Sequence, residues 1–229
     1  MMDCDACDMD TRVFRIGCSR RDWLSHFSVL VAGLPALRVH AAARRRLILI
    51  VGNSLSAEYG LKRGSGWVAL LEQRLARERI DADLVNASIS GDTTSGGRSR
   101  LPALLREHRP THVMIELGGN DALRGLPLDL TRTNLVAMTR AAAGNGASVM
   151  LLGMQVPPNY GRKYSQDFAN LFAGVAKQEG ALLVPFLLKG VADVPQTESM
   201  FQSDRIHPTE AAQASILDNV WPVLKPLLK

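Results

Sequence analysis

The sequence of 229 residues predicts an α/β protein in which a parallel sheet of five strands is covered by helices on both faces. Five aliphatic runs have the length of strands, and helical periodicity fills the gaps between them. Because successive parallel strands need long crossover connections, this alternation favours a parallel sheet. No repeat, low-complexity tract or linker interrupts the series, so we interpret residues 44–229 as a single domain.

The elements alternate in a regular order along the chain. The first expected strand ends abruptly at Gly52, where a small polar loop begins. Each expected helix ends near glycine, proline or a charged loop, as helices commonly do. The expected strands cover residues 47–51, 83–87, 111–117, 148–153 and 181–186, and the expected helices cover 66–78, 98–108, 128–143, 166–179 and 209–227.

Residues 1–43 differ from the rest of the chain. Arginines between positions 12 and 21 precede an apolar, charge-free stretch over 23–37, and small residues around Ala41 offer a cleavage site. This pattern predicts a cleaved export signal and a periplasmic or secreted protein. Because the stretch is too short to span a membrane, we expect no stable membrane insertion after processing. "SRRDWL" (19–24) resembles a twin-arginine motif, so that route and general secretion both stay open; the alternative is an amphipathic extension retained in the cytoplasm.

Composition and cysteine spacing argue against a nucleic-acid partner and a metal site. The net charge is +5, but the basic residues are scattered, and aromatic residues make up only 5% of the chain, so no nucleic-acid groove is predicted. The three cysteines, Cys4, Cys7 and Cys18, all lie in the predicted leader. "CDAC" has the spacing of a zinc or redox site but lacks a second pair, so we predict no metal site.

Polar loops follow the expected strands and precede the last helix. They read "GNSLS", "NASISGDTTSGG", "GGND" and "SDRIHP". In open parallel sheets, ligands bind at the carboxyl ends of the strands, so these loops are the expected site. Together they offer a serine, a flexible glycine, an asparagine amide and an Asp/His pair, which are the groups that acyl transfer requires.

The spacing of these residues assigns a role to each. A serine hydroxyl becomes nucleophilic when a base accepts its proton, and His207 is the candidate base for Ser54. Asp204, three residues earlier, can orient one imidazole nitrogen while the other faces the serine. The oxyanion would be stabilised by the N–H of Ser54 or its neighbour, the N–H of Gly91 and the amide of Asn120. Ser56 is the rival nucleophile, and we expect its hydroxyl to cap or pack instead.

These motifs resemble the SGNH (GDSL-type) hydrolase superfamily, whose four name-giving positions fall on Ser54, Gly91, Asn120 and His207. The resemblance extends over residues 45–228 and includes "NASISGDT", "SRLPALL", "ELGGNDALRGLP", "PPNYGRKY" and "DRIHP". It implies a three-layer, flavodoxin-like α/β/α fold, no cofactor, and Asp204 as the third member of a catalytic triad. It also implies a mobile loop over an acyl groove and two further lining residues; the substrate-binding residues expected on this basis are Leu123, Leu126, Pro127, Val156 and Pro157.

The function that the resemblance implies is that of a serine esterase and thioesterase. Such an enzyme hydrolyses acyl thioesters, lysophospholipids, and aryl or short-to-medium-chain carboxylic esters through an acyl-enzyme intermediate. The family's first motif carries aspartate before the nucleophile, whereas this chain has Asn53. Two alternatives remain: a carbohydrate acetylesterase of the same superfamily, and, because of Asn53, a binding homologue whose activity is impaired. We expect a monomer that acts on a small acyl-ester or lysolipid substrate.

Overall fold

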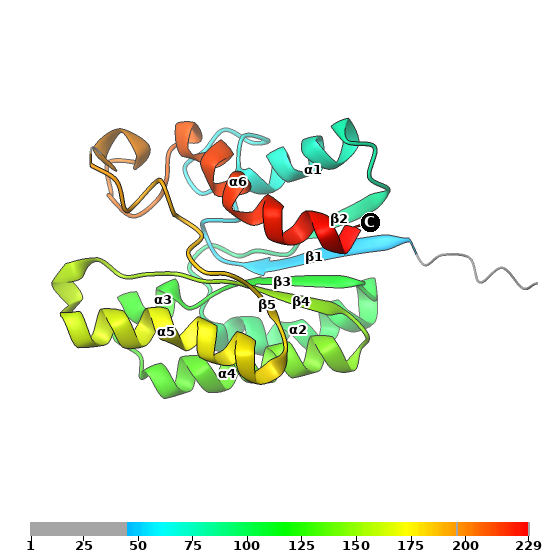
Figure 1. The fold of residues 1–229 in the computed structure, drawn as a ribbon, viewed down its shortest axis with the longest axis horizontal. Coiled ribbons are helices and arrows are strands. Elements are labelled where there is room, and N and C mark those ends of the chain that lie inside the picture. The colour runs from blue at the N-terminus through cyan, green and yellow to red at the C-terminus, as the bar shows by residue number, and fades with distance from the viewer. Residues whose placement is uncertain (1–44, 196, 229) are drawn as a thin grey trace, which may run out of the picture. The chain divides into compact units, whose positions relative to one another are not determined.

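The computed structural model describes residues 45–195 and 197–228, and the predicted export signal lies outside them. The sheet has five parallel strands in the order β2-β1-β3-β4-β5. This arrangement confirms the predicted parallel α/β fold (Figure 1). The strands are β1 (Arg46–Gly52), β2 (Ala82–Asn86), β3 (His112–Glu116), β4 (Ser148–Leu152) and β5 (Leu182–Val184).

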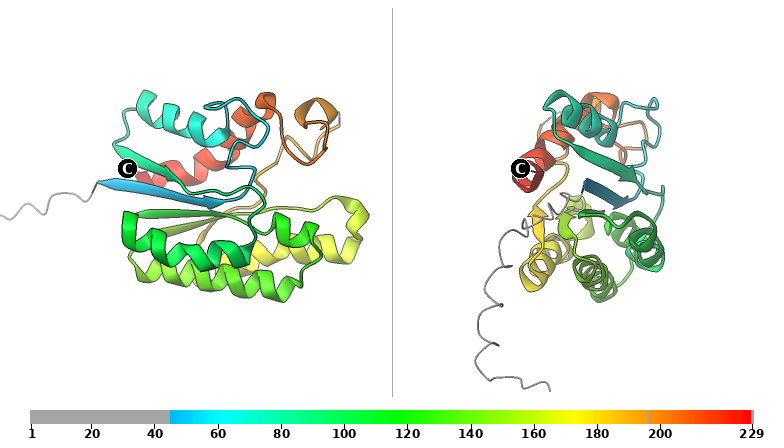
Figure 2. Two further views of the ribbon diagram at one scale, coloured as in Figure 1. Left: turned by 180° about the vertical axis from the view of Figure 1, so that it is seen from behind. Right: turned by 90° about the vertical axis from the view of Figure 1, so that its right-hand side faces the viewer.

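Helices cover both faces of the sheet, which gives the predicted three layers (Figures 1 and 2). Helices α1 and α6 pack together on one face, and α2, α4 and α5 lie on the other. The α-helices of the described chain are α1 (Trp67–Arg77), α2 (Thr94–His108), α3 (Gly119–Leu123), α4 (Leu128–Gly144), α5 (Arg162–Glu179) and α6 (Gln213–Leu224). Short 3₁₀ helices are η1 (Pro158–Tyr160), η2 (Thr197–Met200), η3 (Glu210–Ala212) and η4 (Lys225–Leu228).

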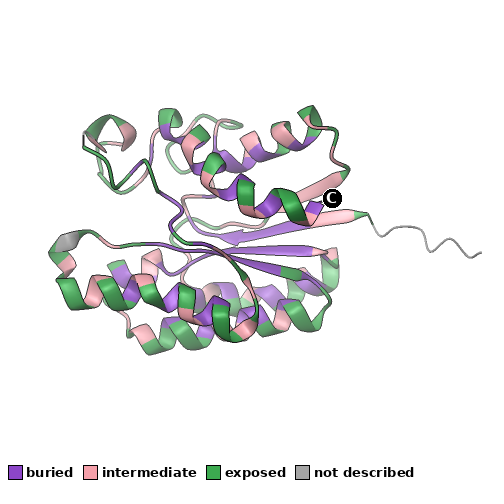
Figure 3. Cartoon of the chain, viewed as in Figure 1, coloured by how far each residue is buried: buried purple, intermediate pink, exposed green. Residues whose placement is uncertain are grey.

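The core lies between the sheet and the two helical layers (Figure 3). In β1, Ile48 to Val51 are fully buried, because the strand is covered on both faces. Every residue of β3 is also buried, including the polar His112 and Glu116. Burying one such aliphatic side chain stabilises the fold by about 1.5–3 kcal/mol. The two central strands are therefore a rigid base for the loops that leave their carboxyl ends.

Three local differences from the sequence prediction bear on the site. Helix α2 begins four residues earlier than predicted, because the Thr93 side chain accepts the Gly96 N–H at 3.4 Å and caps the helix. Residues 119–123 form the short α3 where only a loop was predicted. The predicted helix over 209–227 is divided into η3, α6 and η4. Along the described residues no helix is long and apolar enough to cross a membrane.

Candidate active site

The four sequence-predicted loops lie at the carboxyl-terminal edge of the sheet. Ser54 follows β1 directly, and Gly91 lies in the connection from β2 to α2. Asn120 is in the first turn of α3, just after β3, and His207 precedes η3. The fold therefore gathers residues that are up to 153 positions apart in the sequence.

Ser54, His207 and Asp204 form one continuous hydrogen-bonded chain. His207 Nε2 lies 2.8 Å from Ser54 Oγ, and His207 Nδ1 lies 2.6 Å from Asp204 Oδ2. An ionised carboxylate only accepts hydrogen bonds, so it fixes the proton on Nδ1 and leaves Nε2 free to accept the serine O–H. This is the arrangement in which an imidazole can remove a proton from a serine.

The loop around Asp204 holds its carboxylate in the ionised form. Oδ1 accepts the N–H groups of Ile206 and His207, at 2.9 and 3.0 Å. Burial by itself would raise the pKa of Asp204, but the hydrogen bonds from His207 and Ile206 outweigh it and lower this pKa to about 2. The carboxylate therefore stays charged and able to orient the imidazole at any pH above that value.

A second set of contacts joins the His207 loop to the Ser54 loop. The ring of Tyr59 packs against the imidazole of His207, with centroids 4.3 Å apart and planes 37° apart. The backbone N–H of Gln202 donates to His207 O at 2.8 Å, and its side-chain Nε2 donates to Tyr59 O at 2.9 Å. Sequence reasoning missed both residues, because neither tyrosine nor glutamine is part of an acyl-transfer motif.

Three hydrogen-bond donors lie in the loops that surround the serine. Neither the Ser54 N–H nor the Gly91 N–H donates to a group in the described part of the chain. Gly91 has φ of +79°, which a residue with a Cβ adopts only with strain. Asn120 donates one side-chain hydrogen to Asp92 O at 2.9 Å, and its second amide hydrogen is available to a ligand. These are the three donors that the sequence analysis expects to bind an oxyanion.

Comparison with known proteins identifies the family. The model of the GDSL-like lipase/acylhydrolase family matches residues 50–214. The chain belongs to this family. It is therefore an acylhydrolase of the GDSL type, as the sequence motifs predict.

Relatives support the assignment along most of the chain. The chain is 51% identical over 202 residues to esterase TesA of Pseudomonas aeruginosa, covering 88% of this chain and 99% of that protein. It is 39% identical over 187 residues to thioesterase 1/protease 1/lysophospholipase L1 of Escherichia coli K12, covering 82% and 87%. A crystal structure of TesA matches with a TM-score of 0.77 at 54% identity, covering 80% of this chain and 100% of that one.

Asn53 occupies the position where the GDSL motif carries aspartate. It is buried, and its Oδ1 accepts the Leu55 N–H at 3.0 Å, which an aspartate carboxylate would equally do. The backbone carbonyl of Asn53 accepts the N–H groups of Ser56 and Ala57. The side-chain carbonyl of Asn53 thus makes the local turn that leads into the Ser54 loop.

The buried carboxyl of Glu116 lies beside Asn53. Its Oε2 accepts the Asn53 N–H at 3.0 Å and the Ser56 hydroxyl at 2.9 Å, while Oε1 has no hydrogen-bond partner among the described residues. Burial raises the pKa of Glu116 to about 7, although the hydrogen bonds from Asn53 and Ser56 oppose the rise. Ser56 is 1% exposed and bonded to Glu116, so it packs as predicted and cannot reach a substrate.

The expected substrate-binding residues lie in two segments that leave the same edge of the sheet. Leu123 ends α3 and is 44% exposed, Leu126 is half-buried, and Pro127 precedes α4. Val156 and Pro157 follow β4, the first half-buried and the second exposed. Further exposed apolar side chains, Tyr59, Ile89 and Ile206, stand in the loops that carry the site.

Buried contacts fix the short helix that carries Asn120. The carboxylate of Asp121 is fully buried and accepts the N–H of Thr94 at 2.9 Å as well as the Thr94 hydroxyl. Arg124 donates to Gly91 O at 2.8 Å and links α3 to the neighbouring loop. Within the described ranges no group of three or more His, Cys, Asp and Glu side chains is arranged to hold a metal ion.

Proposed function

We propose that the protein hydrolyses acyl esters and thioesters by transferring the acyl group to Ser54. The observation that carries the proposal is the hydrogen-bonded chain from Ser54 Oγ through His207 to Asp204. Ser54 Oγ attacks the acyl carbonyl while His207 Nε2 takes its proton, and Asp204 stabilises the resulting imidazolium. His207 then gives the proton to the leaving alcohol or thiol, and an acyl-enzyme forms.

Water completes the cycle by the same route. His207 Nε2 removes a proton from the water, the hydroxyl attacks the acyl carbon, and the proton returns to Ser54 Oγ as the carboxylic acid leaves. In both steps the negative oxygen would bind the N–H groups of Ser54 and Gly91 and the amide of Asn120. No cofactor or metal takes part in this proposal.

The proposed substrates are small esters with an apolar acyl chain. Leucine, isoleucine and valine side chains in the loops around the serine favour hydrocarbon over a sugar, which would require polar and aromatic contacts. The names of the relatives include esterase, thioesterase and lysophospholipase, which supports the same range. We further propose that residues 44–229 form the mature, monomeric domain and that residues 1–43 direct its export.

A substrate panel with a serine variant tests the proposal. Purified protein is assayed with p-nitrophenyl esters of increasing chain length, acyl-CoA, lysophospholipid and an acetylated sugar. Ser54→Ala is expected to lose more than 99% of the turnover, whereas Ser99→Ala, an exposed serine of α2, is expected to retain it. Full turnover in Ser54→Ala would refute the mechanism, and a preference for the acetylated sugar would favour the carbohydrate acetylesterase.

A further inference from the structure

We propose that Arg100 is a positioning residue for the oxyanion donors, because its guanidinium fastens together the chain segments that carry them. The inference rests on the proposed function, since it concerns how the donors around Ser54 are held. Arg100 lies in the second turn of α2 and its side chain is 20% exposed. In the sequence it lies within "SRLPALL", one of the phrases that resemble the family, but no role is predicted for it there.

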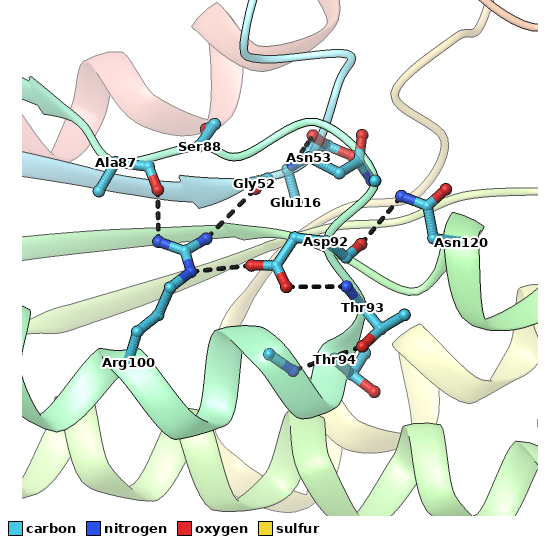
Figure 4. Close-up of polar contacts among 12 residues, drawn as sticks. Gly52, Asn53, Ala87, Ser88, Asp92, Thr93, Thr94, Arg100, Glu116 and Asn120 are labelled. Carbon is cyan, nitrogen blue, oxygen red and sulfur yellow. Dashed lines mark hydrogen bonds and ion pairs between the residues drawn. The ribbon is translucent and has the colours of Figure 1, made fainter.

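The guanidinium contacts three segments (Figure 4). It donates through Nη1 to Ala87 O, through Nη2 to Gly52 O at 3.3 Å, and through Nε to Asp92 Oδ2 at 2.8 Å. Gly52 ends β1, and Ala87 follows the last residue of β2. One side chain therefore joins the carboxyl ends of two adjacent strands to the loop between β2 and α2.

Each proposed oxyanion donor is close in the chain or in space to one of these contacts. The Ser54 N–H is two residues beyond Gly52, and the Gly91 N–H belongs to the residue before Asp92. The Asn120 amide donates to Asp92 O at 2.9 Å (Figure 4). A shift of the Asp92 segment would therefore displace the Gly91 N–H and the Asn120 amide together.

Contacts to both carboxylate oxygens of Asp92 hold the ion pair with Arg100 in place. The Asp92 side chain is only 11% exposed, and its second oxygen accepts the Thr93 N–H at 3.0 Å. A Cβ at Gly96 would overlap that same oxygen, so glycine leaves the space that the carboxylate occupies. Preorganised donors of this kind stabilise a developing charge without moving during the reaction, which is why their placement affects turnover.

Only arginine can make this set of contacts. Its planar guanidinium offers five N–H donors in a fixed geometry, whereas lysine has a single flexible ammonium. Arg100→Lys therefore keeps the positive charge beside Asp92 but cannot hold both strand-end carbonyls as well. Because removal of one oxyanion donor lowers turnover about 100- to 1000-fold, we expect misplacement of two to lower kcat about 10- to 100-fold.

The test separates positioning from folding by comparing kcat with KM. For Arg100→Lys, kcat for a p-nitrophenyl ester should fall by that factor per titrated active site, with KM changed less than about threefold. Arg106→Lys, an exposed arginine at the other end of α2, is the matched control and should keep both constants within twofold. Active-site titration with a fluorophosphonate counts folded sites, so loss of folded protein does not mimic loss of kcat.

A double-variant cycle supplies the second readout. If Arg100 acts through the Asn120 donor, the fall in kcat of Arg100→Lys combined with Asn120→Ala should be smaller than the product of the single falls. A multiplicative fall, or an Arg100→Lys enzyme within twofold of wild type in kcat, would overturn the inference. A wild-type protein without ester hydrolysis would instead overturn the proposed function, so the two failures are distinguishable.

Discussion

Asn53→Asp restores the residue of the GDSL motif and places a second carboxyl beside the buried Glu116. In the wild-type protein, burial raises the pKa of Glu116 from 4.5 to about 7, and Asn53 donors oppose the rise. The variant adds a like charge beside Glu116, which raises the pKa of Glu116 further. We expect the two carboxyls to share one proton near neutral pH.

The size of the effect follows from linkage between protonation and folding. When the pKa of a carboxyl is higher in the folded than in the unfolded protein, the free energy of unfolding is larger at low pH, where the carboxyl is protonated in both states. It falls as the pH rises from the unfolded to the folded pKa. For Glu116 the loss begins near pH 4.5, is complete above pH 7 and amounts to about 3 kcal/mol. For two adjacent carboxylates, taken as about 4 Å apart, the repulsion is about 4 kcal/mol at an effective dielectric constant of about 20, and sharing of one proton reduces it. The free energy of unfolding of Asn53→Asp should therefore be about 1–3 kcal/mol lower than that of wild type at pH 9, with little difference at pH 5.

Urea unfolding at pH 5, 7 and 9 measures this difference directly, with ester turnover recorded on the same samples. Glu116→Gln, which removes the titrating group, should flatten the pH dependence between pH 5 and 9. Combining it with Asn53→Asp leaves one carboxylate beside one amide and should recover stability at pH 9. If the free energy of unfolding changed with pH by the same amount in Asn53→Asp and in wild type, the predicted coupling between position 53 and Glu116 would be refuted. An inert wild type with a highly active Asn53→Asp would show that Asn53 is not tolerated.

Three further variants test individual parts of the site and core. Asn120→Ala should cost about 2.7–4 kcal/mol of transition-state stabilisation, measured as a 100- to 1000-fold lower kcat/KM. Asp204→Asn should lower kcat about 100- to 10,000-fold, measured with a p-nitrophenyl ester, because His207 loses its orienting carboxylate. Since the pKa of Asp204 is about 2, any loss of wild-type activity between pH 7 and pH 4 should come from protonation of a group other than Asp204. Gly97→Ala would drive a Cβ into Leu117 and should lower the free energy of unfolding by about 1–3 kcal/mol, measured in urea.

The sequence predicted the strands well because their aliphatic runs are continuous and bounded by turns. It also predicted where the candidate loops lie, since Ser54 and Asn120 follow strands and His207 precedes a helix, and parallel sheets bind ligands at this edge. The short α3 was missed, because its five residues are held by tertiary contacts of Asp121 rather than by helical periodicity. Local hydrophobic patterns alone thus predicted the α/β fold class.

Supporting residues could not be predicted from local patterns. Arg100 contacts a carbonyl 48 residues away, and Glu116 contacts a backbone N–H 63 residues away. Both residues lie in phrases that resemble the family, but these phrases do not show which distant groups the two side chains contact. The packing of Tyr59 against His207 joins two loops that only the finished fold brings together.

The proposed mechanism depends on Ser54 being the nucleophile of an acyl-transfer reaction. A fluorophosphonate probe, followed by mass spectrometry of the digested protein, identifies the residue that attacks. We expect one probe per chain, attached to Ser54, with loss of ester hydrolysis in proportion to labelling and no labelling of Ser54→Ala. A fully active protein that takes up no probe, or takes it up at Ser56 or another residue, would show that Ser54 is not the nucleophile.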